Sequence, residues 1–491
     1  MRISLIFLLL CGLTAQAVAT ETRVDSTGSI DMVLWDETSD LTPYNFGNPA
    51  GMALLPSGGE VGLNIPWFQV SSSNYNGSFF GLSPGVYQGF PDLINTTSGL
   101  NNTAGLQYQG FNYVTPDKWA LQATGSYSDN QFPLGDSILE NAQLGHGLIR
   151  VAHEFGPLSV GTEFQYTTGT YYLTGGNNLT GNVTGPSQLN MGILANIQLG
   201  NDQHPCWLRL GGSVGFDLSP GQTESISGSG NSITTYTYAT ANTVISPCVF
   251  LEIPGSLQAG VIVNATSDAT SISASFPSGS GLTSGGPDLF ETYTNNINLV
   301  FCKWKMTLSP SQETNPLSLN CGILFGVTSE TVSAPGDIYN NFNLQSSQLQ
   351  IGMGLERSKN FTIGLQLDAQ ANNLTQSVAT EPNSSGNLIE VCLGMEKWLS
   401  PEWALRLGLV YQNEPTNDGF NPEYFNVPVP LQETAWMTTL GIGYDVKNFK
   451  IDAMTFLDPE SVGAIGVDSG NTTTTYTIFG FELSAEVLFD N

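Results

Sequence analysis

The chain has 491 residues, of which 13 are Lys or Arg and 42 are Asp or Glu, so its formal net charge is −29 at pH 7. Only 11% of residues are charged and 55 are Gly, whereas ordinary soluble domains have about 25% charged residues and about 7% Gly. The charge argues against nucleic-acid binding, because no basic patch could neutralise phosphate. The composition also disfavours coiled coils and helical bundles, and 10% aromatic residues disfavour a disordered acidic chain.

The first residues are typical of an export signal. A short basic start precedes an apolar run over residues 3–13, and two small-x-small sites follow, the second ending at Ala19. We therefore predict a signal peptide over residues 1–19 with cleavage near Ala19. A lipoprotein interpretation of Cys11 is the weaker alternative, because Leu10 is too large to precede a lipidated cysteine.

The rest of the chain shows long stretches in which apolar and polar residues alternate with a period of two. Such stretches occur at 119–127, 348–356, 361–370 and 403–412. Each is about ten residues long, which is enough to cross a bilayer core as a tilted barrel strand. One face is apolar and the other is rich in Gln, Asn, Ser, Thr and Gly, as lipid outside and water inside require. The pattern predicts a transmembrane antiparallel β-barrel.

Short turns recur along the chain, and each is followed by a bulky residue that opens a new alternating stretch. These opening residues are Trp119, Leu158, Trp207, Leu257, Leu317, Phe361, Trp403 and Phe449. Longer Gly/Asn/Ser/Thr-rich connections lie between them, as in barrels with tight periplasmic turns and long outer loops. With an opening strand near 62–71 and a closing strand near 475–489, we predict about 18 strands, with 14 or 16 as alternatives. The stretch 142–155 alternates poorly and is the candidate for a β-bulge.

The segment before the first predicted strand carries a recognisable motif. Its residues are Asn48, Pro49, Ala50, Gly51 and Met52, followed by the Leu54-Leu55 pair. The motif resembles the N-terminal signature of the long-chain fatty-acid transporter (FadL-type) family and of related outer-membrane barrels. That resemblance implies a small plug over residues 20–58 that enters the barrel from the periplasmic side, and an apolar solute. A flexible periplasmic leader is the alternative, and the barrel itself is expected over residues 59–491.

The cysteines offer two candidate disulfides. Cys302 and Cys321 are nearly equidistant from a predicted turn, and Cys206 and Cys248 are roughly symmetric about a predicted loop, so each pair could lie within bridging reach in an oxidising compartment. The alternation places Cys302 and Cys321 on different faces, which opposes their bridge. No C-x-x-C spacing is present, so a structural zinc site is not expected.

We do not expect an enzyme, a metal or a cofactor. The three histidines, His146, His153 and His204, have no Ser or Asp clearly set against them in the predicted strands, as a catalytic triad would require. The expected partners are outer-membrane lipid and lipopolysaccharide, the barrel-assembly machinery and a small-molecule solute.

Five charged residues are predicted to line the lumen. They are Glu356, Asp368, Arg406, Lys450 and Asp452. With the net charge of −29, such a lumen should favour cations over anions; the alternative is that these groups only keep the wall wet. The alternation also predicts that an Arg is costly at Leu365, on the lipid face, and mild at Gln366, on the lumen face.

The sequence therefore favours an outer-membrane barrel, in a Gram-negative-type bacterium, for passive uptake of small solutes, hydrophobic ones included, through a plugged lumen. An open, cation-preferring porin and a surface-display or adhesion barrel without transport are the alternative hypotheses.

Overall fold

The computed structural model describes the barrel strands and part of the segment that precedes them. The described residues are 27, 30, 32–35, 43, 47–72, 76–79, 108–133, 139–174, 179–184, 188–201, 203–218, 222–227, 233–240, 243–275, 288–309, 316–333, 342–357, 360–376, 384–415, 431–466 and 470–489. The expected signal peptide, residues 1–19, lies outside them. None of the described helices is long and apolar enough to span a membrane.

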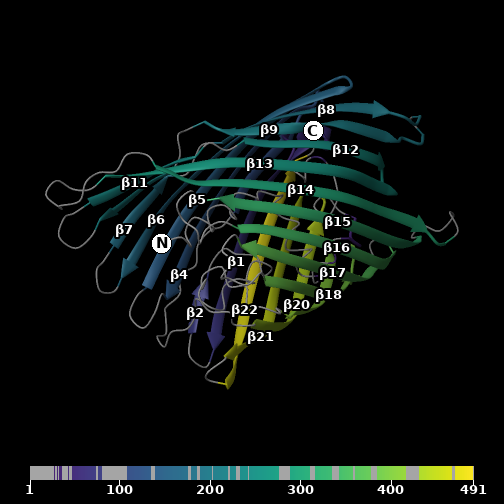
Figure 1. Ribbon diagram of the computed structural model, residues 1–491. Helices are drawn as coiled ribbons and strands as arrows, with labels where there is room; N and C mark the ends of the chain where they lie inside the picture. The colour runs from purple at the N-terminus through teal and green to yellow at the C-terminus, as the bar shows by residue number, and fades with distance from the viewer. Residues whose placement is uncertain are drawn as a thin grey trace.

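All described strands belong to one antiparallel sheet of 22 segments (Figure 1). A 3₁₀ helix, η1, spans Pro49–Leu54 and precedes them. The strands are β1 Gly58–Ser72, β2 Asn76–Phe79, β3 Tyr108–Val114, β4 Trp119–Pro133, β5 Leu139–Phe155, β6 Leu158–Thr174, β7 Leu179–Thr184, β8 Gln188–Gln198, β9 Trp207–Asp217, β10 Gln222–Ser227, β11 Ile233–Thr240, β12 Thr243–Ile253, β13 Leu257–Ser275, β14 Asp288–Thr307, β15 Leu317–Ser333, β16 Phe342–Arg357, β17 Phe361–Gln376, β18 Ser384–Trp398, β19 Trp403–Pro415, β20 Leu431–Val446, β21 Phe449–Gly466 and β22 Gly470–Phe489.

The sheet closes on itself as an 18-stranded barrel. The last strand, β22, pairs with β1 over a long register, and β1 pairs with β3 on its other side. The four short segments β2, β7, β10 and β11 are continuations of through-strands: β7 and β8 both pair with β6, for example, and β11 and β12 both pair with β13. The predicted strand number is therefore confirmed, and closure gives each of the 18 described through-strands a paired neighbour on both sides.

The predicted strand starts are also confirmed. Each of the eight bulky residues that follow a short turn is the first residue of a strand, from Trp119 at β4 to Phe449 at β21. Some of these residues are well exposed next to the turns, such as Trp119 and Trp403. Aromatic side chains at this depth are typical of the girdle at a membrane interface.

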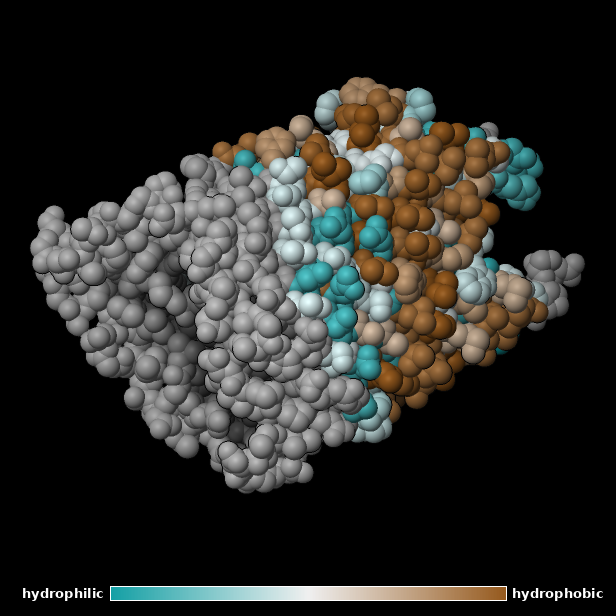
Figure 2. All heavy atoms as spheres, viewed as in Figure 1, coloured by the Kyte–Doolittle hydropathy of each residue, from teal (hydrophilic) through white to brown (hydrophobic). Residues whose placement is uncertain are grey.

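The outer surface of the barrel is apolar. On β17, Ile363, Leu365 and Leu367 are exposed, whereas Gln366 between them is buried. The same alternation continues around the sheet, and Figure 2 shows a band of apolar side chains across the visible wall with more hydrophilic side chains along its border. Exposing an apolar surface of this extent to water is unfavourable, so the exposed face is the one that lipid covers.

Two local predictions differ from the structure. The stretch expected to hold a bulge, now β5, pairs with β4 and β6 without a register shift. The shift instead falls between Thr270 and Ser271, where β13 pairs with β14. Three of the longer connections, which their composition predicts as loops over 72–100, 175–186 and 218–233, contain the short strands β2, β7 and β10. The wall continues outward beyond the apolar band there, and its strand edges need partners.

Candidate functional site: the inner wall and the N-terminal segment

Helix η1 packs against the inside of the barrel wall. Asn48 caps it, and its side-chain Oδ1 accepts a hydrogen bond of 3.0 Å from the backbone N–H of Ala50, as Asn does at helix starts. Residues 49–53 are buried, and the helix contacts β5, β6 and β8. We call this contact the η1 seat.

Glycines make the η1 seat possible. A Cβ placed on Gly192 would lie 2.9 Å from Cδ of Pro49, and a Cβ on Gly161 would overlap the backbone of Pro49 and Ala50. Only a residue without a side chain lets the helix backbone come this close to the strands. A second anchor is polar: Nζ of Lys118 donates a 3.0 Å hydrogen bond to the carbonyl oxygen of Leu55.

An earlier part of the N-terminal segment contacts a different part of the wall. Ile30, Met32, Val33 and Leu34 are buried, and three of them pack with Cys392 of β18 and Val410 of β19. We call this contact the Met32 seat. Its glycines again face the segment, since a Cβ on Gly364 or Gly394 would come within 3.0 Å of Ile30.

Hydrogen bonds from the wall hold the backbone at the Met32 seat. The N–H of Met32 donates to Oε1 of Gln366 at 2.9 Å, and Nδ2 of Asn320 donates to the carbonyl oxygen of Val33 at 2.9 Å. The ammonium of Lys303, fully buried, lies 5.2 Å from the ring centroid of Trp35, a cation–π distance. These side chains satisfy backbone groups of residues 32–35, which form no helix or strand.

Four of the five predicted lumen charges lie near the short-turn end of the barrel in ion pairs. Arg406 donates from Nε to Glu396 at 2.8 Å and pairs through Nη1 with Asp452. Lys305 donates to Glu356 at 2.8 Å, and Lys450 lies 3.6 Å from Glu486. Arg150 with Glu163 and Arg209 with Glu252 form further pairs at this end. We call this ring of paired charges the collar.

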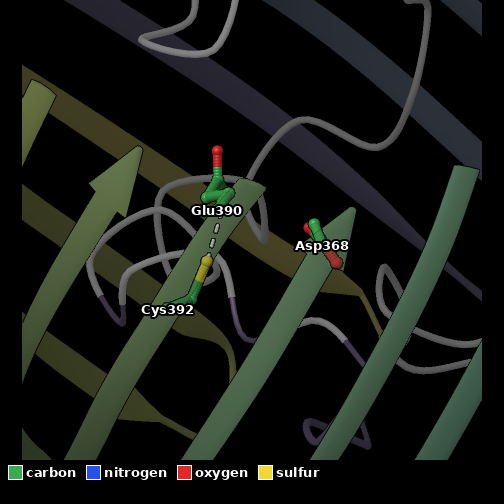
Figure 3. A group of neighbouring side chains, drawn as sticks. All are labelled: Asp368, Glu390 and Cys392. Atoms are coloured by element: carbon green, nitrogen blue, oxygen red, sulfur yellow. Dashed lines mark hydrogen bonds between the residues drawn. The ribbon is translucent and has the colours of Figure 1, made fainter. Parts of the chain in front are cut away.

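The fifth predicted residue, Asp368, lies away from the collar, near the middle of β17. Asp368 is directly opposite Glu390 of β18, and Cys392 follows two residues later on the same face (Figure 3). Their oxygen and sulfur atoms lie within 4.8 Å of one another, an arrangement that could hold a metal ion. These atoms already have protein partners, however: Cys392 donates to Glu390 at 3.0 Å, and the amide of Gln366 donates to Asp368 at 3.2 Å. We therefore assign no metal to this group.

Basic residues keep to one end of the barrel. Within the described ranges, every Lys and Arg lies in a short turn or within a few residues of the strand end next to one. They are Lys118, Arg150, Arg209, Lys303, Lys305, Arg357, Lys397, Arg406, Lys447 and Lys450.

The candidate disulfides are not made, and none of the five described cysteines forms a disulfide. Cys302 pairs in register with Ile323, and Cys321 pairs with Trp304, so the two cysteines share the outer face but are offset by two residues. The expected placement on different faces is thus wrong. Cys248 is opposite Gly211 on β9, whereas Cys206 lies before the start of β9, so these two are too far apart along the strands.

The histidines take structural positions where the structure describes their side chains. The ring of His153 stacks on Trp119 with centroids 4.1 Å apart, and its Nδ1 lies 3.2 Å from the carbonyl oxygen of Lys118. His204 is exposed in the turn before β9. The strand position of His146 is described but its side chain is not.

Sequence reasoning missed the wall residues that hold the N-terminal segment, chiefly Gln366, Asn320 and Lys303. One signal was available: inward positions of β15 to β18 repeat glycine, at Gly322, Gly352, Gly364 and Gly394. A wall that faces only water does not require glycine at neighbouring inward positions. A row of inward glycines therefore indicates that another chain segment packs closely against the backbone of the wall.

The comparisons with known proteins give similarity of fold only. No family model matches the sequence, and no curated protein matches it. Among solved structures, the chain is similar to the CymD monoaromatic hydrocarbon channel, with 12% identity, coverage of 97% of this chain and 98% of that one, and a TM-score of 0.38. The P. putida toluene transporter TodX has 10% identity, coverage of 98% and 100%, and a TM-score of 0.37. A Pseudomonas aeruginosa FadL homologue has 11% identity, coverage of 97% and 99%, and a TM-score of 0.35.

Proposed function

We propose that this protein is an outer-membrane channel for passive uptake of small solutes, and that residues 20–58 act as its plug. The barrel supports the first part, because its wall is closed and apolar outside, and its buried charged and amide side chains face inward, as a membrane pore requires. Short turns would face the periplasm and long connections the cell exterior of a Gram-negative-type bacterium. The FadL-type resemblance of the motif at 48–52 favours a hydrophobic solute.

The observation that carries the plug proposal is the burial of two separate parts of the N-terminal segment inside the barrel. Met32 and Ala50 both belong to an apolar cluster with the inward side chains Phe250, Phe301 and Leu324. A flexible leader in the periplasm would leave these wall residues facing water. We therefore expect the segment to restrict flow until a solute displaces part of it.

Deleting residues 20–46 should convert a nearly silent protein into a conducting one in planar bilayers. The deletion removes the Met32 seat contacts and leaves the η1 seat intact, so the barrel keeps its packed helix. Steady conductance of the full-length protein would instead support the open porin. Silence of both forms, with both folded by their heat-modifiable mobility in detergent gels, would support the display barrel.

Substituting Gly394 by Val should release the Met32 seat without any deletion. The new side chain would overlap the carbonyl oxygen of Thr27 and the side chain of Ile30, so the segment must shift. We expect a maleimide to label Cys392, which is buried beneath that seat, at least about tenfold faster. Cys248 lies in the apolar cluster of Met32 but is also covered by η1, since its sulfur lies 3.9 Å from Nδ2 of Asn48, so its labelling should accelerate much less than that of Cys392.

The matched control is Gly147→Val on β5, where a Cβ meets nothing within 4 Å. It should leave both labelling rates unchanged. If Gly394→Val and Gly147→Val raise the labelling rate of Cys392 equally, the result would contradict the plug proposal. The faster labelling would then come from a general loosening of the barrel wall.

A further inference from the structure

Positive charge is absent from the outer half of every described strand. The described basic residues lie at the short-turn end, and only Arg2, Arg23 and Lys359 fall outside the described ranges. Arg2 belongs to the expected signal peptide, and Lys359 follows the end of β16 by two residues, between β16 and β17. The sequence therefore has almost no cation left for the outer half of the barrel.

Carboxylates follow no such restriction. On inward positions, Asp368 and Glu390 lie near mid-strand, while Asp217 and Glu330 lie close to the outer ends of β9 and β15. Further Asp and Glu positions occur in the outer parts of β4, β10, β13, β14, β19, β20 and β21. Whatever partner each carboxylate has, the three remaining basic residues cannot offset this excess.

The two ends of the lumen thus differ in their balance of positive and negative charge. At the collar, cations and anions are paired, as in Arg406 with Glu396 and Asp452, and their fields largely cancel. Towards the outside, charges of one sign lie in a passage with a low-dielectric wall, which focuses the field and raises the local concentration of counter-ions about 10- to 1,000-fold. An anion that approaches from outside meets repulsion before it reaches the plug.

We propose that the outer half of the lumen selects solutes by charge, admitting neutral and cationic molecules and excluding anions such as free carboxylates. This inference rests on the proposed passage of solutes and narrows it: a hydrophobic solute would cross as a neutral compound. The collar contributes little to this selection, because its five cations offset all but one of its six carboxylates. The long connections need not take part, since the strands alone supply the asymmetry.

Thiol reactivity in the outer lumen of the full-length protein tests the proposal. Ser346 of β16 suits it: its Oγ accepts a 3.0 Å hydrogen bond from Nε2 of Gln370, and it is opposite Thr328, so that Glu330 is its diagonal neighbour at about 7–8 Å. Ser346→Cys would be made in a chain whose native cysteines are replaced by Ser. Its rates with a cationic trimethylammonium-ethyl, an anionic sulfonato-ethyl and a neutral methyl methanethiosulfonate would be compared with those of a free thiol.

We expect the neutral reagent to react, and the cationic-to-anionic rate ratio to exceed that of the free thiol by more than about tenfold. Adding Glu330→Gln should reduce the ratio, and about 1 M salt should abolish most of it, because the Debye length falls to about 3 Å. The control, Asn448→Cys, lies in an exposed short turn beside Lys447 and should show no cationic preference.

A ratio at Ser346→Cys equal to the free-thiol value would overturn the proposal, as would failure of the neutral reagent to react in a folded barrel, because the outer lumen would then be closed. The thiol rates need no solute to cross the membrane. If the conductance experiment shows no flow in either form, the proposed passage of solutes is wrong, but a measured charge preference at Ser346→Cys remains valid. If the thiol rates show no charge preference, the selection proposal is wrong, but the conductance result is unaffected.

Discussion

Replacing Leu365 by Arg should lower the free energy of unfolding by about 2–4 kcal/mol, because a cation near mid-depth on the lipid face of a barrel loses its hydration. Leu365 is 49% exposed at the centre of the outward apolar run of β17, between Ile363 and Leu367, which are exposed as well. Urea unfolding in phospholipid vesicles, followed by tryptophan fluorescence, measures the effect.

The matched control for Leu365→Arg is Gln370→Arg on the same strand. Gln370 lies on the inward face and is partly exposed, so an Arg there can stay hydrated and should cost less than about 1 kcal/mol. Gln366 is not the mild position that alternation alone predicts: it is 1% exposed, and its Oε1 holds the backbone N–H of Met32. Equal tolerance of Arg at positions 365 and 370 would show that lipid does not cover this face.

Replacing Arg406 by Leu should destabilise the barrel by about 3–5 kcal/mol. The guanidinium is buried and pairs with two buried carboxylates, Glu396 and Asp452. Removing one partner of a buried ion pair leaves uncompensated charge in a low-dielectric site, which costs far more than the pair itself contributes. The same urea titration measures the loss.

Lys397→Leu controls for the loss of a cation from the same region. Lys397 precedes the turn between β18 and β19, is exposed, and its Nζ donates to the side chain of Asn360, so its removal should change stability by less than about 1 kcal/mol. If Arg406→Leu costs no more than Lys397→Leu, the collar charges are better solvated than their burial indicates. Neutralising both acids in the Arg406→Leu background should restore part of the lost stability, because it removes the unpaired charges.

The sequence predicted the transmembrane wall almost completely. Strand starts such as Trp119, Leu257 and Phe449 follow turn residues directly, and the side-chain period of two fixes which face meets lipid. Turn residues and alternation both depend only on residues close together in the chain, so they predict strand starts and faces even when the neighbouring strands are unknown. The outer continuations β2, β7 and β10 were missed because they are short and rich in the residues that also form loops.

The cysteine predictions failed because they needed register. Symmetry about a turn placed Cys302 opposite Cys321, but the pairing of β14 with β15 sets Cys302 against Ile323. Alternation also placed the two cysteines on different faces, whereas both lie on the outer face and are offset by two residues. The face and the register of such a residue are fixed only when the neighbouring strand is in place.

The amino-acid sequence alone determined that this chain closes into a membrane barrel, because alternation and turn residues act between neighbours in the chain. Only the tertiary structure decided which inward residues hold the N-terminal segment and which charges pair at the collar. Those contacts join residues as distant as Met32 and Gln366, 334 positions apart, and they arise only when ring closure and strand register bring the inner wall around the segment.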